Sequence, residues 1–128
     1  MRAAPEGLID PLLKTIGFYD GDEPLALLHY YAVHPTSIDG TGQVTPEFVG
    51  LARERRTAER GVPHIYFNGC AGNVTAGKYN DGIADNRELF AGRLREAMVA
   101  SEQALGRRPL GAVGRAGVPG RSPPREAR

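Results

Sequence analysis

Two runs of apolar residues near the start of the chain predict a β-hairpin. Residues 12–19 and 25–34 are rich in apolar and β-branched side chains, and the turn-forming sequence Asp20-Gly-Asp-Glu-Pro24 separates them. Pro24 has no amide to donate to a sheet, so we expect the second strand to begin just after it. The second run does not alternate between apolar and polar positions, which indicates a strand that is buried on both faces.

Residues 45–61 have the pattern of an amphipathic helix. Thr45 suits the cap, Pro46 the first helical position and Glu47 the positive end of the helix dipole. Gly61 then ends the helix. The predicted buried face consists of Phe48, Leu51, Ala52 and the aliphatic stem of Arg55, and the predicted solvated face consists of Arg53, Glu54, Arg56 and Glu59.

A short aromatic run at residues 64–68 predicts a third strand, which leads into a glycine-rich loop at residues 69–77. Asp85 and Glu88 fit a capping box at the start of a second helix, which Gly106 ends. The apolar stripe of this helix is predicted to be Leu89, Leu94, Ala97, Met98, Ser101 and Leu105. The chain is therefore predicted to be mixed α/β, in the order β-hairpin, helix, strand with glycine-rich loop, helix.

Composition divides the chain into a folded part and a tail. The length of 128 residues, 41% of them apolar, allows one domain with a modest core, which we assign to residues 1–105. Residues 106–128 contain five glycines, four prolines and six arginines, and such a segment cannot bury enough surface to offset its ordering entropy. We therefore predict a disordered tail there.

Charge and cysteine content exclude some classes of function. Residues 1–105 hold 10 Lys and Arg against 14 Asp and Glu, a balance opposite to that of a nucleic-acid-binding surface. The single Cys70 excludes an internal disulfide, so packing alone must hold the fold. No segment approaches the roughly 18 apolar residues of a membrane span, and the N-terminal residues lack the apolar stretch of a secretion signal. Localisation and oligomeric state stay open.

Polar side chains capable of chemistry follow two of the predicted strands. His34, Thr36 and Ser37 come directly after the second strand, and Asn73 and Thr75 lie in the loop after the third. In open sheets flanked by helices, ligands bind beyond the carboxyl ends of the strands, where side chains are accessible without breaking the ladder. These two stretches therefore predict one enzyme site.

Each of these signals also has a structural interpretation. A lone histidine is a weak metal signal, because zinc sites use three or four protein ligands, and a hydroxyl after a proline most often closes a turn. His29 and His64 are interpreted as hydrogen-bonded structural residues. The loop at residues 69–77 matches neither a phosphate loop nor a dinucleotide fingerprint. Its amides leave open a non-catalytic anion-binding module, and a purely structural remnant is a further alternative.

Taken together, the two stretches resemble the amidase domain of the neutral ceramidase family and its bacterial ceramidase-like branch, over roughly residues 5–105. In that family a strand ends in His-Gly-Thr-Ser, and this chain has His34-Pro-Thr-Ser37. A later strand of the family leads to Ala-Gly-Asp-Val-Ser-Pro-Asn, where this chain has Ala71-Gly-Asn-Val-Thr-Ala-Gly77. The differences from the family pattern include a proline for a glycine and an asparagine for an aspartate.

The resemblance implies a zinc-dependent hydrolase of linear amides, in which zinc polarises the carbonyl and lowers the pKa of bound water toward about 7. It implies that His34 is a zinc ligand and that Thr75 and Asn73 occupy catalytic positions. Gly69, Gly72 and Ser37 would orient the substrate or hold the oxyanion. The family's other ligands, a histidine upstream and a glutamate and tyrosine downstream, have no counterpart here.

The resemblance therefore also implies that this chain is an internal fragment of a larger catalytic domain and is inactive alone. The substrate would be a small-molecule or lipid amide, such as an N-acylsphingosine of sphingolipid metabolism or another N-acyl amide.

Overall fold

The computed structural model describes residues 3–5, 7–38, 42 and 44–111. It contains strands β1 (Lys14–Asp20), β2 (Glu23–Tyr31) and β3 (His64–Asn68), helices α1 (Glu47–Arg60) and α2 (Asn86–Gln103), and a 3₁₀ turn, η1 (Ala76–Lys78). The mixed α/β class and the order of elements predicted from the sequence are confirmed. Most of the predicted tail, at residues 112–128, lies outside the described residues.

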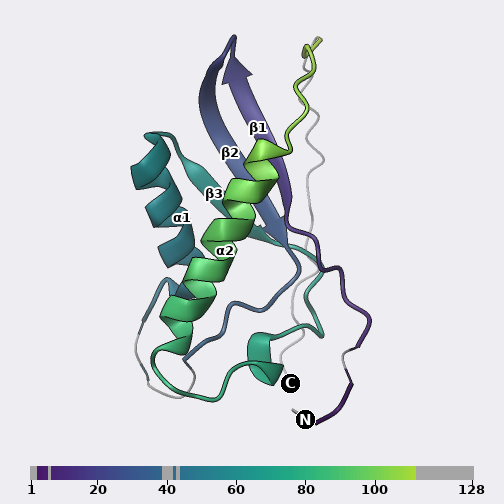
Figure 1. The fold of residues 1–128 in the computed structure, drawn as a ribbon, viewed down its shortest axis with the longest axis vertical. Helices are drawn as coiled ribbons and strands as arrows, with labels where there is room; N and C mark the ends of the chain where they lie inside the picture. Colours follow the sequence, from purple (N-terminus) through teal and green to yellow (C-terminus); the bar gives the residue numbers. More distant parts are fainter. Residues whose placement is uncertain (1–2, 6, 39–41, 43, 112–128) are drawn as a thin grey trace, which may run out of the picture.

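The three strands form one sheet in the order β1-β2-β3. β1 and β2 pair antiparallel as the predicted hairpin, whereas β2 and β3 are parallel. Parallel neighbours need a crossover connection, which α1 provides. As a result β2 is the central strand, and the carboxyl ends of β2 and β3 lie at the same edge of the sheet (Figure 1).

Pro24 lies inside β2 and not before it. The strand begins at Glu23, and Pro24 pairs with Tyr19 where the register shifts between Phe18 and Tyr19. An irregular step tolerates a residue that cannot donate to the ladder. The prediction that Pro24 precedes the strand is therefore wrong by two residues.

Both helices pack on the same face of the sheet (Figure 1). Leu27 and His29 of β2 point toward the helices and are fully buried. The opposite face carries apolar side chains that remain 40–50% exposed, namely Ile16, Phe18, Ile65 and Phe67. Within the part of the chain that the structure describes, β2 is thus covered on one face only, and the prediction of burial on both faces is wrong.

The hydrophobic core lies between the two helices and the end of β2. Phe48 of α1 and Phe90 of α2 meet edge to face, with ring centroids 5.7 Å apart and an interplanar angle of 74°. The other buried members of the cluster are Val33, Ala52, Ala91, Leu94 and Met98. This core fixes α1 against α2 and anchors the segment that follows β2.

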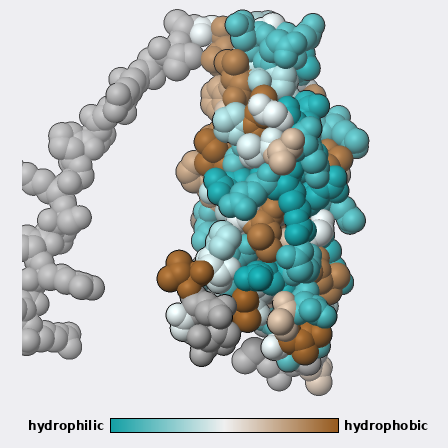
Figure 2. Space-filling view, turned by 90° about the vertical axis from the view of Figure 1, so that its left-hand side faces the viewer, coloured by the Kyte–Doolittle hydropathy of each residue, from teal (hydrophilic) through white to brown (hydrophobic). Residues whose placement is uncertain are grey.

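Helix α1 matches the prediction in extent but is rotated from it. Pro46 is the cap residue and makes no side-chain hydrogen bond to the helix, so the prediction of Thr45 as the cap and Pro46 as the first helical residue is wrong by one position. Gly61 ends the helix in the left-handed region with a φ of 71°. Arg56, which was placed on the solvated face, is only 6% exposed. It follows Ala52 by one helical turn, so it shares the buried face. Polar residues predominate on the side of the molecule where α1 lies, with hydrophobic ones between them (Figure 2).

Helix α2 differs from the prediction at both ends. It ends at Gln103 with Ala104 as the cap residue, so the prediction that Gly106 ends it is wrong by two positions. Asp85 makes no capping hydrogen bond through its side chain, and Glu88 instead pairs with Arg55 of α1 at 2.5 Å. Leu89, predicted to be buried, is 49% exposed, and the core position belongs to Phe90. The predicted capping box and the start of the apolar stripe are therefore wrong, because an interhelical ion pair takes the glutamate.

Candidate functional site

His34 and Thr75 are neighbours in the structure although 41 positions separate them in the sequence. Their backbones form an isolated parallel bridge, in which the amide of His34 donates to the carbonyl of Val74 over 2.8 Å. The bridge lies outside the named strands, three residues after the last ladder residue of β2, Tyr31, and seven after that of β3, Asn68. Residues from the two stretches singled out in the sequence therefore meet at one edge of the sheet.

The His34 ring has a defined orientation at this junction. Its Nδ1 lies 3.3 Å from the carbonyl oxygen of Val74 and donates to it, since a carbonyl can only accept. The proton on Nδ1 leaves a lone pair on Nε2, and the ring is exposed. Histidines that bind metals commonly hold their other ring nitrogen against a carbonyl in this way.

Ser37 lies close in sequence to His34 but plays a structural part. It is 2% exposed, and both its amide and its hydroxyl donate to the carboxylate of Glu47, the amide at 2.9 Å. Asn80 donates to the Ser37 carbonyl, also at 2.9 Å. Glu47 has a left-handed φ of 56°, an uncommon backbone for a residue with a Cβ. These bonds fix the turn that follows β2.

The loop residues predicted to hold the oxyanion differ in how available they are to a ligand. The amide of Gly69 donates to the carbonyl of Tyr31 at 2.9 Å, so the sheet already uses it. A Cβ on Gly69 would lie 3.3 Å from the backbone of Ala32, which explains a glycine there. Gly72 and Asn73 are exposed beyond it. The loop therefore offers Gly72 and Asn73 to a ligand, and Gly69 serves the close approach of β2.

A cavity of about 290 Å³ lies beside the junction. Thr75 lines it, together with Tyr79 and Arg93, whereas His34 does not. Its walls are otherwise apolar and include Leu13, Tyr31, Val33, Phe48, Val74, Phe90 and Leu94. Apolar clefts with a few convergent polar groups are typical of small-molecule sites.

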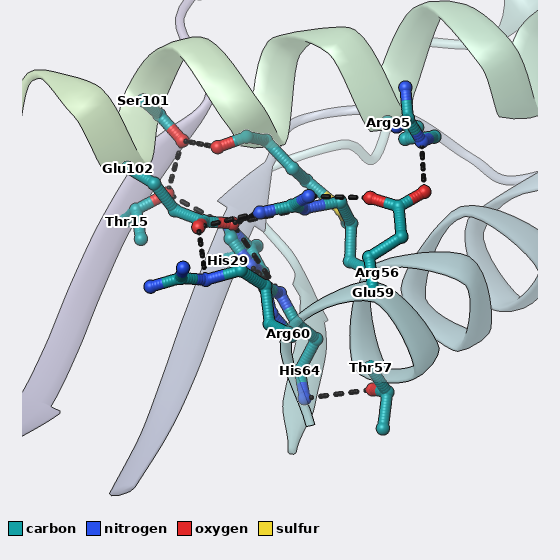
Figure 3. A network of polar contacts seen from close by, with 11 residues as sticks. Thr15, His29, Arg56, Thr57, Glu59, Arg60, His64, Arg95, Ser101 and Glu102 are labelled. Atoms are coloured by element: carbon teal, nitrogen blue, oxygen red, sulfur yellow. Dashed lines mark hydrogen bonds and ion pairs between the residues drawn. The ribbon is translucent and has the colours of Figure 1, made fainter. Parts of the chain in front are cut away.

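A second group of polar side chains is buried between the helices and the sheet (Figure 3). The guanidinium of Arg56 donates to both carboxylate oxygens of Glu102, at 2.8 and 2.7 Å, and to Glu59 at 2.6 Å. His29 Nε2 and His64 Nδ1 lie 2.9 Å apart, and His64 Nδ1 is 3.7 Å from Glu102. All five elements that form the sheet and the two helices contribute to this group, with Thr15 and Ser101 at its other end.

The geometry fixes where the protons of this network sit. The Ser101 hydroxyl donates to the Met98 carbonyl at 2.9 Å, so it accepts from Thr15, whose Oγ1 is 2.6 Å away. Thr15 in turn accepts from His29 Nδ1 at 2.9 Å. Neutral His29 therefore has a bare Nε2, which accepts from His64 Nδ1. His64 Nε2 is left bare, buried and without a hydrogen-bond partner.

Both imidazoles are disposed to stay neutral. Burial, followed by the neighbouring His64 and Arg56, lowers the pKa of His29 to about 4. Burial also lowers the pKa of His64, although the Glu102 carboxylate opposes that shift. The hydrogen-bonded structural role predicted for the two histidines is thus what the structure contains.

His29, His64 and Glu102 also form a group whose donor atoms lie within 4.8 Å of one another, a spacing that could hold a metal ion. However, the two imidazoles share a proton, and Arg56 occupies both oxygens of Glu102. A cation would have to displace that proton and lie close to a guanidinium. His34 belongs to no such group of three within the described ranges.

Sequence reasoning missed two components of these sites. Arg56 was assigned to the solvated face, although its spacing of four from Ala52 marks it as a residue of the buried face. Arg93 was not considered, since its exposed position on α2 gives no sequence signal that it borders a cavity. The cavity depends on how α2 lies against the end of β2, which no local pattern encodes.

Comparison with protein-family models, with curated proteins and with solved structures finds no match to this chain. Among the described residues, no helix combines the length and the apolar character that crossing a membrane requires.

Proposed function

We propose that the junction of His34 and Thr75 is part of the active site of a zinc-dependent amide hydrolase of the neutral ceramidase type. The observation that carries the proposal is the bridge between the two residues, with His34 donating to Val74 at 2.8 Å. The sequence resemblance assigns a zinc ligand to the first position and an active-site hydroxyl to the second. A metal-bound water and the Thr75 hydroxyl would both have to reach the same substrate carbonyl. The backbones of His34 and Thr75 are adjacent at the bridge, which supports this arrangement.

The orientation of the imidazole supports a ligand role for His34. Its Nδ1 donates to the Val74 carbonyl, which leaves the lone pair on Nε2 for a metal. In the complete site zinc would polarise the scissile carbonyl and supply hydroxide. Thr75 would orient the substrate from the adjoining position, and the exposed loop residues Gly72 and Asn73 would face the developing oxyanion.

A catalytic zinc needs about three protein ligands, and His34 supplies one of them. The proposal therefore requires further ligands from outside the residues described here. Consequently, we propose that this chain acts as a portion of a larger catalytic domain and does not hydrolyse amides alone. The substrate would be an N-acyl amide.

The test uses the longest gene product that contains this chain. Zinc content and hydrolysis of a fluorogenic N-acyl amide are measured for the wild type and for His34→Ala, Thr75→Ala and Thr75→Ser. His34→Ala is expected to lower zinc stoichiometry and Thr75→Ala to lower the rate at full zinc content, while Thr75→Ser restores the rate. Cys70→Ser, which changes an exposed thiol in the same loop, is the matched control.

Unchanged zinc content in His34→Ala would remove this residue from the metal site. If phosphate and not zinc raised the melting temperature, an anion-binding module would replace the hydrolase proposal. A protein that responded to neither would be a structural remnant.

A further inference from the structure

We propose that the cavity beside Thr75 binds an aliphatic monocarboxylate of medium chain length. The chain would lie among the apolar side chains of the cavity, and the carboxylate would bind the guanidinium of Arg93. The inference goes beyond the hydrolase proposal, because it requires neither a metal ion nor His34.

The apolar walls of the cavity favour a ligand with an alkyl chain. They are made by side chains from five separate segments, which are the residues before β1, the end of β2 with the residues that follow it, helix α1, residues 74–79 after β3, and helix α2. Leu13, Val33, Phe48, Leu94 and Ala97 are representative. Burying an aliphatic chain here removes apolar surface from water on both sides of the contact.

The positive charge of Arg93 at the cavity favours an anionic ligand. Arg93 lines the cavity and is exposed, and it has no ion pair within the described ranges. Two other arginines of the helix pair differ in this respect, since Arg55 pairs with Glu88 and Arg95 with Glu59, each at 2.5 Å. A planar guanidinium matches a single carboxylate through two parallel hydrogen bonds. Thus one unpaired guanidinium beside an apolar cavity suits a ligand with one acidic end.

The size of the cavity limits the length of the chain. A volume of about 290 Å³ corresponds to roughly ten water molecules at about 30 Å³ each, and so to a ligand of about ten non-hydrogen atoms. Octanoate has this size. The hydroxyls of Thr75 and Tyr79 also line the cavity and can donate to a carboxylate.

Octanoate binding is measured on the 128-residue chain without added metal, by calorimetry and by amide chemical shifts. Saturable binding with a Kd of about 1 mM or tighter is expected, which is ordinary for so small a ligand. Arg93→Gln is expected to weaken it about tenfold through loss of a charge-assisted hydrogen bond. The matched control is Arg108→Gln, since Arg108 is exposed and does not line the cavity.

Two further measurements distinguish the contribution of the ligand's alkyl chain from that of its charge. Ala97→Leu fills the cavity and is expected to abolish binding while far-ultraviolet circular dichroism stays unchanged. Octan-1-ol, which lacks the charge, is expected to bind the wild type and Arg93→Gln equally. Absence of saturable octanoate binding would overturn the proposal, and so would wild-type affinity in either Arg93→Gln or a folded Ala97→Leu. Because zinc is left out, failure here and failure of the hydrolase proposal are separate results.

Discussion

His29 of β2 and His64 of β3 share a single hydrogen bond, with 2.9 Å between Nε2 of the first and Nδ1 of the second. Both rings are buried and nearly parallel, with centroids 5.1 Å apart and an interplanar angle of 11°. When both rings are neutral, Nε2 of His64 is the one ring nitrogen of the pair without a hydrogen-bond partner. Protonating the pair places a positive charge beside Arg56, in an environment from which water is excluded.

Acidification is therefore expected to destabilise the fold. The pKa of His29 is about 4 in the folded chain against 6.5 for an unperturbed histidine, so the unfolded chain binds more protons between these values. The free energy of unfolding should fall by roughly 3 kcal/mol as the pH drops from above 6.5 to below 4. Urea denaturation at a series of pH values measures this slope.

The control for the pH effect is His29→Gln, which keeps a donor and an acceptor but cannot titrate. This variant should show a flatter dependence in the same range. An equally steep slope in His29→Gln would assign the effect to other groups.

The buried ion pair between Arg56 and Glu102 predicts an asymmetric mutational response. Arg56→Met leaves the Glu102 carboxylate, 10% exposed, without its three hydrogen bonds from the Arg56 guanidinium, while Arg60 stays 3.7 Å away. Removing one partner of a buried pair typically costs about 3–5 kcal/mol. Arg55→Met breaks the exposed pair with Glu88 instead and should cost less than about 1 kcal/mol. Chemical denaturation of the two variants compares them directly, and equal losses would contradict the burial argument.

The turn after β2 yields a prediction about backbone strain. Glu47 accepts from the amide and hydroxyl of Ser37 while its own φ is 56°. Glu47→Ala should cost about 2 kcal/mol, because it removes these bonds and keeps a Cβ in the left-handed region. Glu47→Gly loses the same bonds but relieves the backbone, so it should be about 1 kcal/mol more stable than Glu47→Ala. Equilibrium unfolding of both variants gives the difference, and the reverse order would show that the backbone is not strained.

Two glycines should respond to alanine with opposite signs. Gly61 ends α1 with a φ of 71°, and a Cβ there is strained, so Gly61→Ala should destabilise by about 1 kcal/mol. Gly92 lies inside α2, and a Cβ added to it meets nothing within 4 Å. Gly92→Ala should therefore stabilise by roughly 0.5–1 kcal/mol through helix propensity. Thermal melts suffice to test both signs.

Local sequence signals predicted most of the elements. The hairpin, the end of α1 at Gly61 and the whole of β3 followed from turn formers, a helix stop and an aromatic run, which act over a few residues. The errors arose where a contact distant in sequence competes with a local preference. Glu88 pairs with Arg55 and does not cap α2, and Arg56 is buried because Glu102 on the other helix neutralises it.

In the candidate site, too, local sequence signals predicted some features, whereas others depend on contacts distant in sequence. Strand ends mark His34 and Thr75 in the sequence, and parallel pairing of β2 with β3 brings their backbones together. The occupied amide of Gly69 and the buried hydroxyl of Ser37 could not be foreseen, because both depend on partners supplied by the tertiary fold. The roles proposed for His34, Asn73 and Thr75 stay predictions.

One backbone atom sets the direction of the whole relay beneath α2. The Met98 carbonyl can only accept, and through Ser101, Thr15 and His29 it dictates which nitrogen of His64 is bare. Unwinding the last turn of α2 would break the hydrogen bond from the Ser101 hydroxyl to the Met98 carbonyl. Both hydroxyls and both rings could then reverse their polarity together, so fraying at one helix end would change the tautomer of an imidazole on the far strand.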